Sequence, residues 1–368
     1  MIHESCFLQI KLIFYDNLVE KYQKMQGFQS NTICVHQAEH QGYTILKPGL
    51  MFDKQVYKYT EDTGTIFETT VNGKTFTVSS VCDGHAGYMT SFFTTSIIEK
   101  EFNKAIAETE GDVEKALALL FENIGKEMLK MELHLRGSGS TCNVTVFDST
   151  NARVYVASLG DSPTLKYVKN NQNRYVLDWR SQDQDCADPL EVERMVAIHI
   201  KNGDVNATPD SVVYEVEVNG DKTGVWRNKK SEMMLHSSFG DFPRDYYPGV
   251  VNIVPRIWSC EWGNSDVWIQ CSDGLMEWLS YKSRSIQPRT EFRVEEIARH
   301  LDICAGDENI AHRLHELQID SMVEAKEKAF PGANHSTREW VEANFDNHMT
   351  KVFTKKVAHT DDENKLID

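Results

Sequence analysis

The order of the apolar segments constrains the fold of this chain more than any other feature of its sequence. Three β-rich segments, TCNVTVFD, RVYVASLGD and TLKYVKN, follow one another between residues 141 and 170 with no helical segment between them. Before them, residues from about 88 to 132 repeat apolar side chains at helical spacing and predict two successive helices. Neighbouring strands with paired helices favour antiparallel sheets covered by helices over alternating parallel units. We therefore expect an α+β fold.

The remaining segments extend this pattern. Strands are predicted at FTVSSVCDG, DVWIQCSDG and HMTKVF, and helices at GLMEWLSYK, VEEIARHLDIC and IAHRLHELQIDSMVEAKEKA. The segment ADPLEVERMVAIHI predicts a further helix, with Asp188 as its N-cap and Pro189 at its first position. Residues from about 200 to 265 are rich in Gly, Asn and Asp, and we expect loops and short strands there.

The composition excludes several classes of function. With a formal net charge of −16 over 368 residues, the chain lacks the basic surface that nucleic-acid binding requires. No window approaches the roughly 18 apolar residues of a membrane span, and the apolar stretch CFLQIKLIFY lacks the basic lead-in and cleavage site of a signal peptide. The eight cysteines show no Cys-x-x-Cys pair or zinc spacing, which favours buried thiols in a reduced cytoplasmic or nuclear compartment. We expect a monomer.

An aspartate followed by a small or polar residue recurs where the predicted strands begin or end. The four pairs are Asp83-Gly84, Asp161-Ser162, Asp273-Gly274 and Asp346-Asn347. One such pair alone is typical of a plain turn, but carboxylates from separate strand ends can also meet at one edge of a sheet sandwich. Mg²⁺ and Mn²⁺ prefer oxygen ligands, and two such ions would offset the mutual repulsion of the carboxylates and generate hydroxide near neutral pH.

A histidine accompanies the first of these pairs. His85 lies two residues after Asp83, so both side chains point to the same face of an extended segment. An imidazole beside a metal centre could protonate a leaving group. The alternative is a histidine of the surface or the core with no chemical role.

Six segments resemble, in order, the motifs of the metal-dependent protein phosphatases (the PPM, or type-2C, serine/threonine phosphatases). They are VCDGHAG, SGSTCNVTVF, VYVASLGDSPTLKY, SSFGDF, WIQCSDGLMEWLS and FDNHMTKVF. The resemblance implies a four-layer α-β-β-α sandwich of two central antiparallel sheets flanked by helices, with a metal site in a cleft at one end. It implies an N-terminal extension at residues 1–29, a phosphatase domain at 30–356 and an acidic, flexible tail at 357–368.

The resemblance also implies roles for single residues. Asp83 would bridge two core Mn²⁺ or Mg²⁺ ions and so act in catalysis, while Gly84 would offer its carbonyl. Asp273 and Asp346 would complete the shell of the first ion, and Asp161 would bind a weaker third ion. His85 would be the general acid. Supporting positions behind the ligands are expected at Asp53, Asp241 and Asn347.

The sequence departs from the family pattern in its opening motif, Arg-x-x-x-Glu-Asp. The best match, LKPGLMFDKQVY, places Asp53 at the aspartate and Phe52 at the glutamate. Lys47 would then replace the phosphate-binding arginine as a point charge without a bidentate fork. A second register through AEHQGY offers Glu39 instead. Pro163 also replaces an arginine, which removes a positive charge near the site.

Two functions follow from the resemblance and its departures. The first is hydrolysis of phosphoserine and phosphothreonine in proteins by a hydroxide that bridges two metal ions, with a phosphoprotein as substrate. The second is a catalytically weak or inactive relative that acts as a binding or regulatory module, which Phe52 and Pro163 favour. Retention of the strand-end aspartates and His85 favours the first function, since an inactive site has no chemical need for them.

Overall fold

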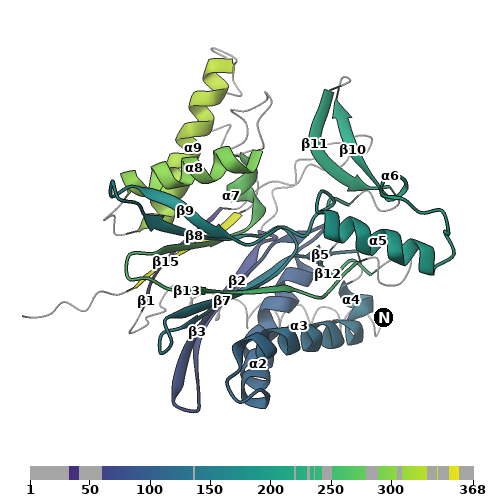
Figure 1. Ribbon diagram of the computed structural model, residues 1–368, viewed down its shortest axis with the longest axis horizontal. Helices are drawn as coiled ribbons and strands as arrows, with labels where there is room; N and C mark the ends of the chain where they lie inside the picture. The colour runs from purple at the N-terminus through teal and green to yellow at the C-terminus, as the bar shows by residue number, and fades with distance from the viewer. Residues whose placement is uncertain are drawn as a thin grey trace, which may run out of the picture.

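The computed structural model describes residues 33–40, 60–135, 137–218, 221–229, 233–235, 237–242, 251–278, 289–304, 309–329, 338 and 348–355. Within these ranges, two five-stranded antiparallel sheets lie face to face between two layers of helices (Figure 1). The predicted α+β fold with antiparallel sheets flanked by helices is thereby confirmed. The proposed boundaries of the domain, its extension and its tail stay predictions.

The two sheets have simple strand orders. The first sheet runs β13-β7-β6-β3-β2, with bounds Arg256–Glu261, Arg153–Leu159, Cys142–Asp148, Lys74–Cys82 and Thr63–Val71. The second sheet runs β1-β15-β14-β8-β9, with bounds Ile33–His40, His348–Lys355, Val267–Cys271, Thr164–Lys169 and Tyr175–Arg180. The strands predicted from the sequence are all present in these sheets, which also include β1, β2 and β9, for which no strand was predicted.

The helices cover the outer faces of the two sheets. On the first sheet pack α2 (Met89–Glu108) and α3 (Val113–Lys130), and on the second pack α8 (Arg289–Ile303) and α9 (Ile310–Ala329) (Figure 1). The shorter α4 (Glu132–Leu135) follows α3, and α7 (Asp273–Trp278) follows β14. In α3 the predicted amphipathic face is buried, and the Asp112 side chain accepts the Lys115 N–H to cap the helix.

Apolar side chains fill the spaces between the layers. Phe102, Leu117, Phe121 and Val144 are among those between the first sheet and its helices, and Leu165, Ile269, Ile297 and Leu301 are among those beneath α8 and α9. Between the two sheets, Phe147 stands 4.8 Å from Phe353 and 6.4 Å from Trp268, measured between ring centroids. Because β6 is covered on both faces, every residue of it is buried, including the polar Asn143 and Thr145.

A separate module projects from one side of the sandwich (Figure 1). It contains α5 (Pro189–Lys201), α6 (Pro209–Val212) and the hairpin of β10 (Val213–Val218) with β11 (Asp221–Asn228). Cys186, Met195 and Val212 lie in its small apolar core. The α5 helix begins as predicted, with Asp188 as N-cap and Pro189 in the first turn.

The cysteines and helices also bear on the sequence predictions. The seven cysteines within the described ranges are free thiols, and five of them are buried, as expected for small core residues. Burial raises the pKa of the Cys142 and Cys271 thiols, so both stay protonated.

No helix in the described part of the chain is long and apolar enough to cross a membrane.

Candidate functional site

Two of the strand-end aspartates follow strands that face one another across the sandwich. Asp83 directly follows β3, and Asp273 comes two residues after Cys271, the last residue of β14. Near the ends of these strands, Ser79 Oγ donates to Gln270 Oε1 at 2.7 Å, which fixes β3 against β14. The ends of the two strands that precede these aspartates therefore lie at the same end of the sandwich.

The third aspartate reaches this end through the loop after β7. Asp161 precedes Ser162, whose hydroxyl lies 2.6 Å from Thr141 Oγ1. The same Thr141 hydroxyl accepts the Asp83 N–H at 3.0 Å, so the loop lies directly beside the end of β3. On its other side, the carbonyl of Pro163 accepts the Cys271 N–H at 3.1 Å. The loop with Asp161 thus lies between the two strand ends.

The fourth strand-end aspartate, Asp346, falls outside the described residues, as do Asn347, Lys47 and the pair Phe52-Asp53. The strand that follows Asp346 begins at the same end, because the Ser272 N–H donates to the Met349 carbonyl at 3.0 Å and the Met349 N–H donates to Ser272 Oγ. Glu39 lies near the end of β1, opposite Met349 in the β1–β15 ladder. In the described part of the chain, no three His, Cys, Asp or Glu side chains are grouped to hold a metal ion.

An acidic pair that the sequence reasoning missed lies beside Asp83. Glu61 and Asp62 directly precede β2. Its first residue, Thr63, pairs with Cys82, the last residue of β3, so Asp62 and Asp83 lie at the same end of two adjacent strands. Asp62 is fully buried and Glu61 is 8% exposed. The Asn72-Gly73 turn, with φ values of +52° and +76°, is a strong hairpin signal that would have located β2 and hence the pair before it.

Gly84 is packed too closely for any side chain. A Cβ at this position would lie 2.4 Å from the Glu61 carbonyl oxygen and 2.8 Å from Ser91 Oγ. Ser91 Oγ in turn donates to the Glu61 carbonyl at 2.5 Å, which fixes the acidic segment against α2. Only glycine fits between these groups, and its backbone lies directly between Asp83 and His85.

His85 contacts a second acid of the predicted set. It lies in β4 (Gly84–His85), a two-residue strand, and its Nε2 is 2.7 Å from Asp241 Oδ2. The side chain of Asp241 is 11% exposed and that of His85 is 30% exposed, so the imidazole stays accessible to a substrate. Asp241 was predicted as a supporting residue, but its contact with His85 was not predicted.

Negative charge accumulates around the Asp161 loop. The Gln184 N–H donates to the Gly160 carbonyl at 2.9 Å, which brings the acidic segment 183–188 alongside it. Burial, with a smaller contribution from the Asp183 carboxylate, raises the pKa of Asp185.

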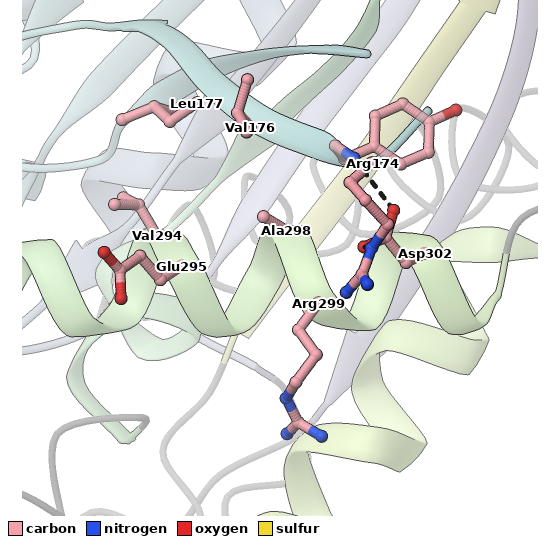
Figure 2. A pocket seen from close by; sticks show the side chains of 9 residues that line it. Arg174, Val176, Leu177, Val294, Glu295, Ala298, Arg299 and Asp302 are labelled. Carbon is pink, nitrogen blue, oxygen red and sulfur yellow. Dashed lines mark hydrogen bonds and ion pairs between the residues drawn. The ribbon is translucent and has the colours of Figure 1, made fainter. Parts of the chain in front are cut away.

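A cavity of about 430 Å³ lies elsewhere, between β9 and α8 (Figure 2). Val176, Val294 and Ala298 line it together with Arg174 and Asp302. The Asp302 carboxylate accepts the Tyr175 N–H at 2.9 Å and pairs with Arg174 at one end of the cavity. None of its lining residues belongs to the strand ends with the aspartates, so it is separate from the candidate site.

The fold and the site together define a class of protein: an α+β sandwich with acidic residues gathered at one end of its two sheets. Residues 65–284 match the family model for protein phosphatase 2C. This match spans more than half of the 368 residues, and the chain belongs to the protein phosphatase 2C family. The comparison with curated proteins gave no match.

Solved structures agree with this assignment at the level of the fold. The chain is similar to serine-threonine phosphatase 2C from Toxoplasma gondii, with 16% identity, a TM-score of 0.60, and coverage of 89% of this chain and 96% of that chain. It is similar to a C. elegans sex determining protein, with 16% identity, a TM-score of 0.55, and coverage of 94% and 73%. A serine/threonine phosphatase from S. agalactiae shares 12% identity, with a TM-score of 0.50 and coverage of 88% and 100%.

Proposed function

We propose that this protein is a metal-dependent phosphatase that hydrolyses phosphoserine and phosphothreonine in proteins. The observation that supports the proposal is that the ends of β3 and β14, which Asp83 and Asp273 follow, and the loop with Asp161 lie at one end of a protein phosphatase 2C fold. These residues come from distant parts of the sequence and offer only oxygen ligands. Oxygen ligands are the ones that Mg²⁺ and Mn²⁺ prefer.

The residues present fit such ions. Gly84 is packed closely against the Glu61 carbonyl and follows Asp83 directly, and the nearby Glu61 and Asp62 side chains are buried. Buried carboxylates in one place need positive charge to offset them. Asp83, the Gly84 carbonyl and Asp273 would hold the core ions together with Asp346, and Asp161 would hold a further ion.

The acidic pair of the opening motif has a better candidate than Phe52-Asp53. Glu61-Asp62 supplies both acids in the family order, directly before the strand that pairs with β3. We therefore infer that the motif-one glutamate is present in this chain. This removes the main argument for a catalytically inactive relative.

The chemistry divides between the ions and the protein. When bound, Mn²⁺ or Mg²⁺ supplies a nucleophile at neutral pH and stabilises charge on the phosphoryl oxygens. The protein positions the phosphoester, and His85 gives a proton to the serine or threonine oxygen as the bond from that oxygen to phosphorus breaks. The products are the free hydroxyl side chain and inorganic phosphate.

The first experiment measures Mn²⁺-dependent hydrolysis of p-nitrophenyl phosphate and of a phosphothreonine peptide. Asp273→Ala should lower kcat by about 10²-fold or more, because it removes charge stabilisation at the reacting group. Asp210→Ala changes an exposed acid of α6 and should leave kcat unchanged. Equal background rates for the wild type and Asp273→Ala would instead identify a non-catalytic binding module.

A further inference from the structure

A small sheet of three two-residue strands holds His85 against Asp241. Its order is β12-β5-β4, with β12 at Phe239–Gly240 and β5 at Gly139–Ser140. Gly139 pairs with His85 on one side and with Gly240 on the other. The sheet therefore brings residue 85 and the residue after Gly240 to the two sides of one glycine.

Gly139 leaves the space in which the two side chains meet. A Cβ on Gly139 would lie 2.1 Å from Asp241 Oδ2 and 2.2 Å from His85 Nε2. Any other residue here would displace one of the two groups. The contact between the carboxylate and the imidazole therefore requires glycine at position 139.

The Asp241 carboxylate is fixed from several directions. Ser238 Oγ donates to Asp241 Oδ2 at 2.6 Å, and the Asp241 N–H donates to the Ser138 carbonyl at 3.0 Å. Its backbone has a φ of +48°, a left-handed conformation that non-glycine residues rarely adopt. Such strain persists only where the surroundings enforce it, and it concentrates at functional sites.

The contact determines which nitrogen of His85 is available for chemistry. A carboxylate can only accept hydrogen bonds, so Nε2 carries the hydrogen in the bond to Asp241. None of the described residues forms a hydrogen bond with Nδ1. Because the imidazole is 30% exposed, Nδ1 is the ring nitrogen that can reach a substrate.

We propose that Asp241 is a positioning residue that holds His85 through Nε2 and leaves Nδ1 to deliver the proton to the leaving oxygen. The proposal rests on the proposed phosphatase function. As a water oxygen bonds to phosphorus, the ester P–O bond breaks and its electron pair stays on the serine or threonine oxygen. That oxygen takes the proton from Nδ1 of His85 in its imidazolium form, which carries a hydrogen on each ring nitrogen, and the imidazole is left neutral with its Nε2–H still bound to Asp241.

This role differs from support of the metal ligands from behind, which the family resemblance implied for Asp241. Oδ2 already accepts from both His85 and Ser238. If Asp241 positions His85, its loss should lower kcat most for substrates whose leaving group needs a proton. A metal-supporting role predicts an equal effect on every substrate.

The test compares two substrates in the full-length protein loaded with Mg²⁺. Asparagine tolerates the left-handed backbone, so Asp241→Asn removes the charge with little strain. We expect kcat for a phosphothreonine peptide to fall by about 10²-fold, the low end of a general-acid contribution. The leaving group of p-nitrophenyl phosphate is stable as an anion, so kcat for it should fall less than about threefold.

Two further variants separate positioning from a structural role. In a His85→Ala background, Asp241→Asn should cause no additional loss with the peptide, because the two residues act as one unit. Asp204→Asn is the matched control: Asp204 Oδ2 lies 3.5 Å from His199 Nδ1 in the module away from the site, and its loss should change neither rate. Equal losses on both substrates, or an additive loss in the double variant, would overturn the proposal.

A spectroscopic measurement tests the proposal independently of activity. Nitrogen-15 NMR of the histidine rings in the Mg²⁺-loaded protein, recorded at a pH at which the rings are neutral, should show His85 with its single hydrogen on Nε2, and Asp241→Asn should reduce that preference. A neutral His85 ring with its hydrogen on Nδ1 in the wild type would refute the contact whether or not the protein hydrolyses phosphoesters. If the wild type hydrolyses neither substrate, the proposed function fails, while the NMR result still decides whether Asp241 holds Nε2.

Discussion

At the scale of single residues, the backbone beside His85 adopts an unusual conformation. Ala86 has a φ of +55°, and Gly87 follows it with a φ of +122°. A Cβ in the left-handed region costs about 1–2 kcal/mol relative to the right-handed one, whereas glycine has no such cost. The alanine at this position, where the family motif has glycine, is therefore more than the addition of a methyl group.

The strain at Ala86 gives a stability prediction. Ala86→Gly should raise the free energy of unfolding by up to about 1 kcal/mol, since relief of the strain exceeds the entropy that glycine adds to the unfolded chain. The matched control is Ala118→Gly on the exposed face of α3, which should lower it by about 1 kcal/mol. Urea unfolding measures both, and a loss of stability in Ala86→Gly would show that residue 86 carries no strain.

The contact between His85 and Asp241 could not be predicted from the sequence. The two residues are 156 positions apart, and they meet through strands of two residues each. Strands this short have no periodicity that a sequence window can detect. Asp83, Asp161 and Asp273 could be placed near strand ends because each comes within two residues after a strand that the sequence predicts, whereas the partner of the histidine depends on tertiary packing.

At the scale of elements, burial separates the strands that could be predicted from those that could not. β6 and β14 are buried throughout and are rich in apolar and β-branched side chains. β9 lies at the edge of its sheet, and none of its residues is buried, so it lacks the buried positions of a core strand. β2 was missed because its second half is polar, and the acidic pair before it was missed with it.

The edge strand β9 depends on a residue of α8. Asp302 accepts the Tyr175 N–H at 2.9 Å and pairs with Arg174. Burial would raise the pKa of Asp302, but these hydrogen bonds outweigh it and hold the pKa below its usual value of 3.8. The carboxylate thus connects the helix layer to an otherwise open sheet edge.

This contact predicts how stability depends on pH. The folded-state pKa of Asp302 is lowered, so its contribution is present above pH 3.8 and is lost as the pH falls through the lower folded value. Asp302→Asn should lower the free energy of unfolding by about 1 kcal/mol at pH 7 and weaken its decline in acid. Glu295→Gln, an exposed residue of the same helix, should change neither. An unaltered acid profile in Asp302→Asn would contradict this account.

At the scale of the whole molecule, the interface between the two sheets changes from apolar to polar toward the end with the aspartates. Phe353 packs near Trp268 in the apolar part. Two residues earlier, on the same face of β15, Lys351 is fully buried. Its Nζ donates to the carbonyls of Thr65 at 2.9 Å and Ser80 at 2.8 Å, which belong to the opposite sheet.

The opposite sheet is shaped to receive this ammonium group. A Cβ on Gly64 would lie 2.9 Å from Lys351 Nζ, so glycine is needed to make room for it. Next to it, Gln270 receives the hydrogen bond from Ser79 that joins β14 to β3. Polar contacts therefore connect the two sheets directly behind the strand ends with the aspartates, and their geometry sets the distance between those ends.

Lys351 should consequently contribute far more to stability than a lysine at the other end of the same strand. Lys351→Met keeps an unbranched apolar side chain, one atom shorter than that of lysine, but it leaves two buried carbonyls without their charged donor, so we expect a loss of about 3 kcal/mol in the free energy of unfolding. Lys355 donates to the Trp262 carbonyl at 2.7 Å in a partly exposed position, and Lys355→Met should cost less than about 1 kcal/mol. Urea unfolding of the two variants gives the comparison directly. Equal losses would mean that the buried ammonium does not hold the sheets together, and that apolar packing alone aligns the strand ends.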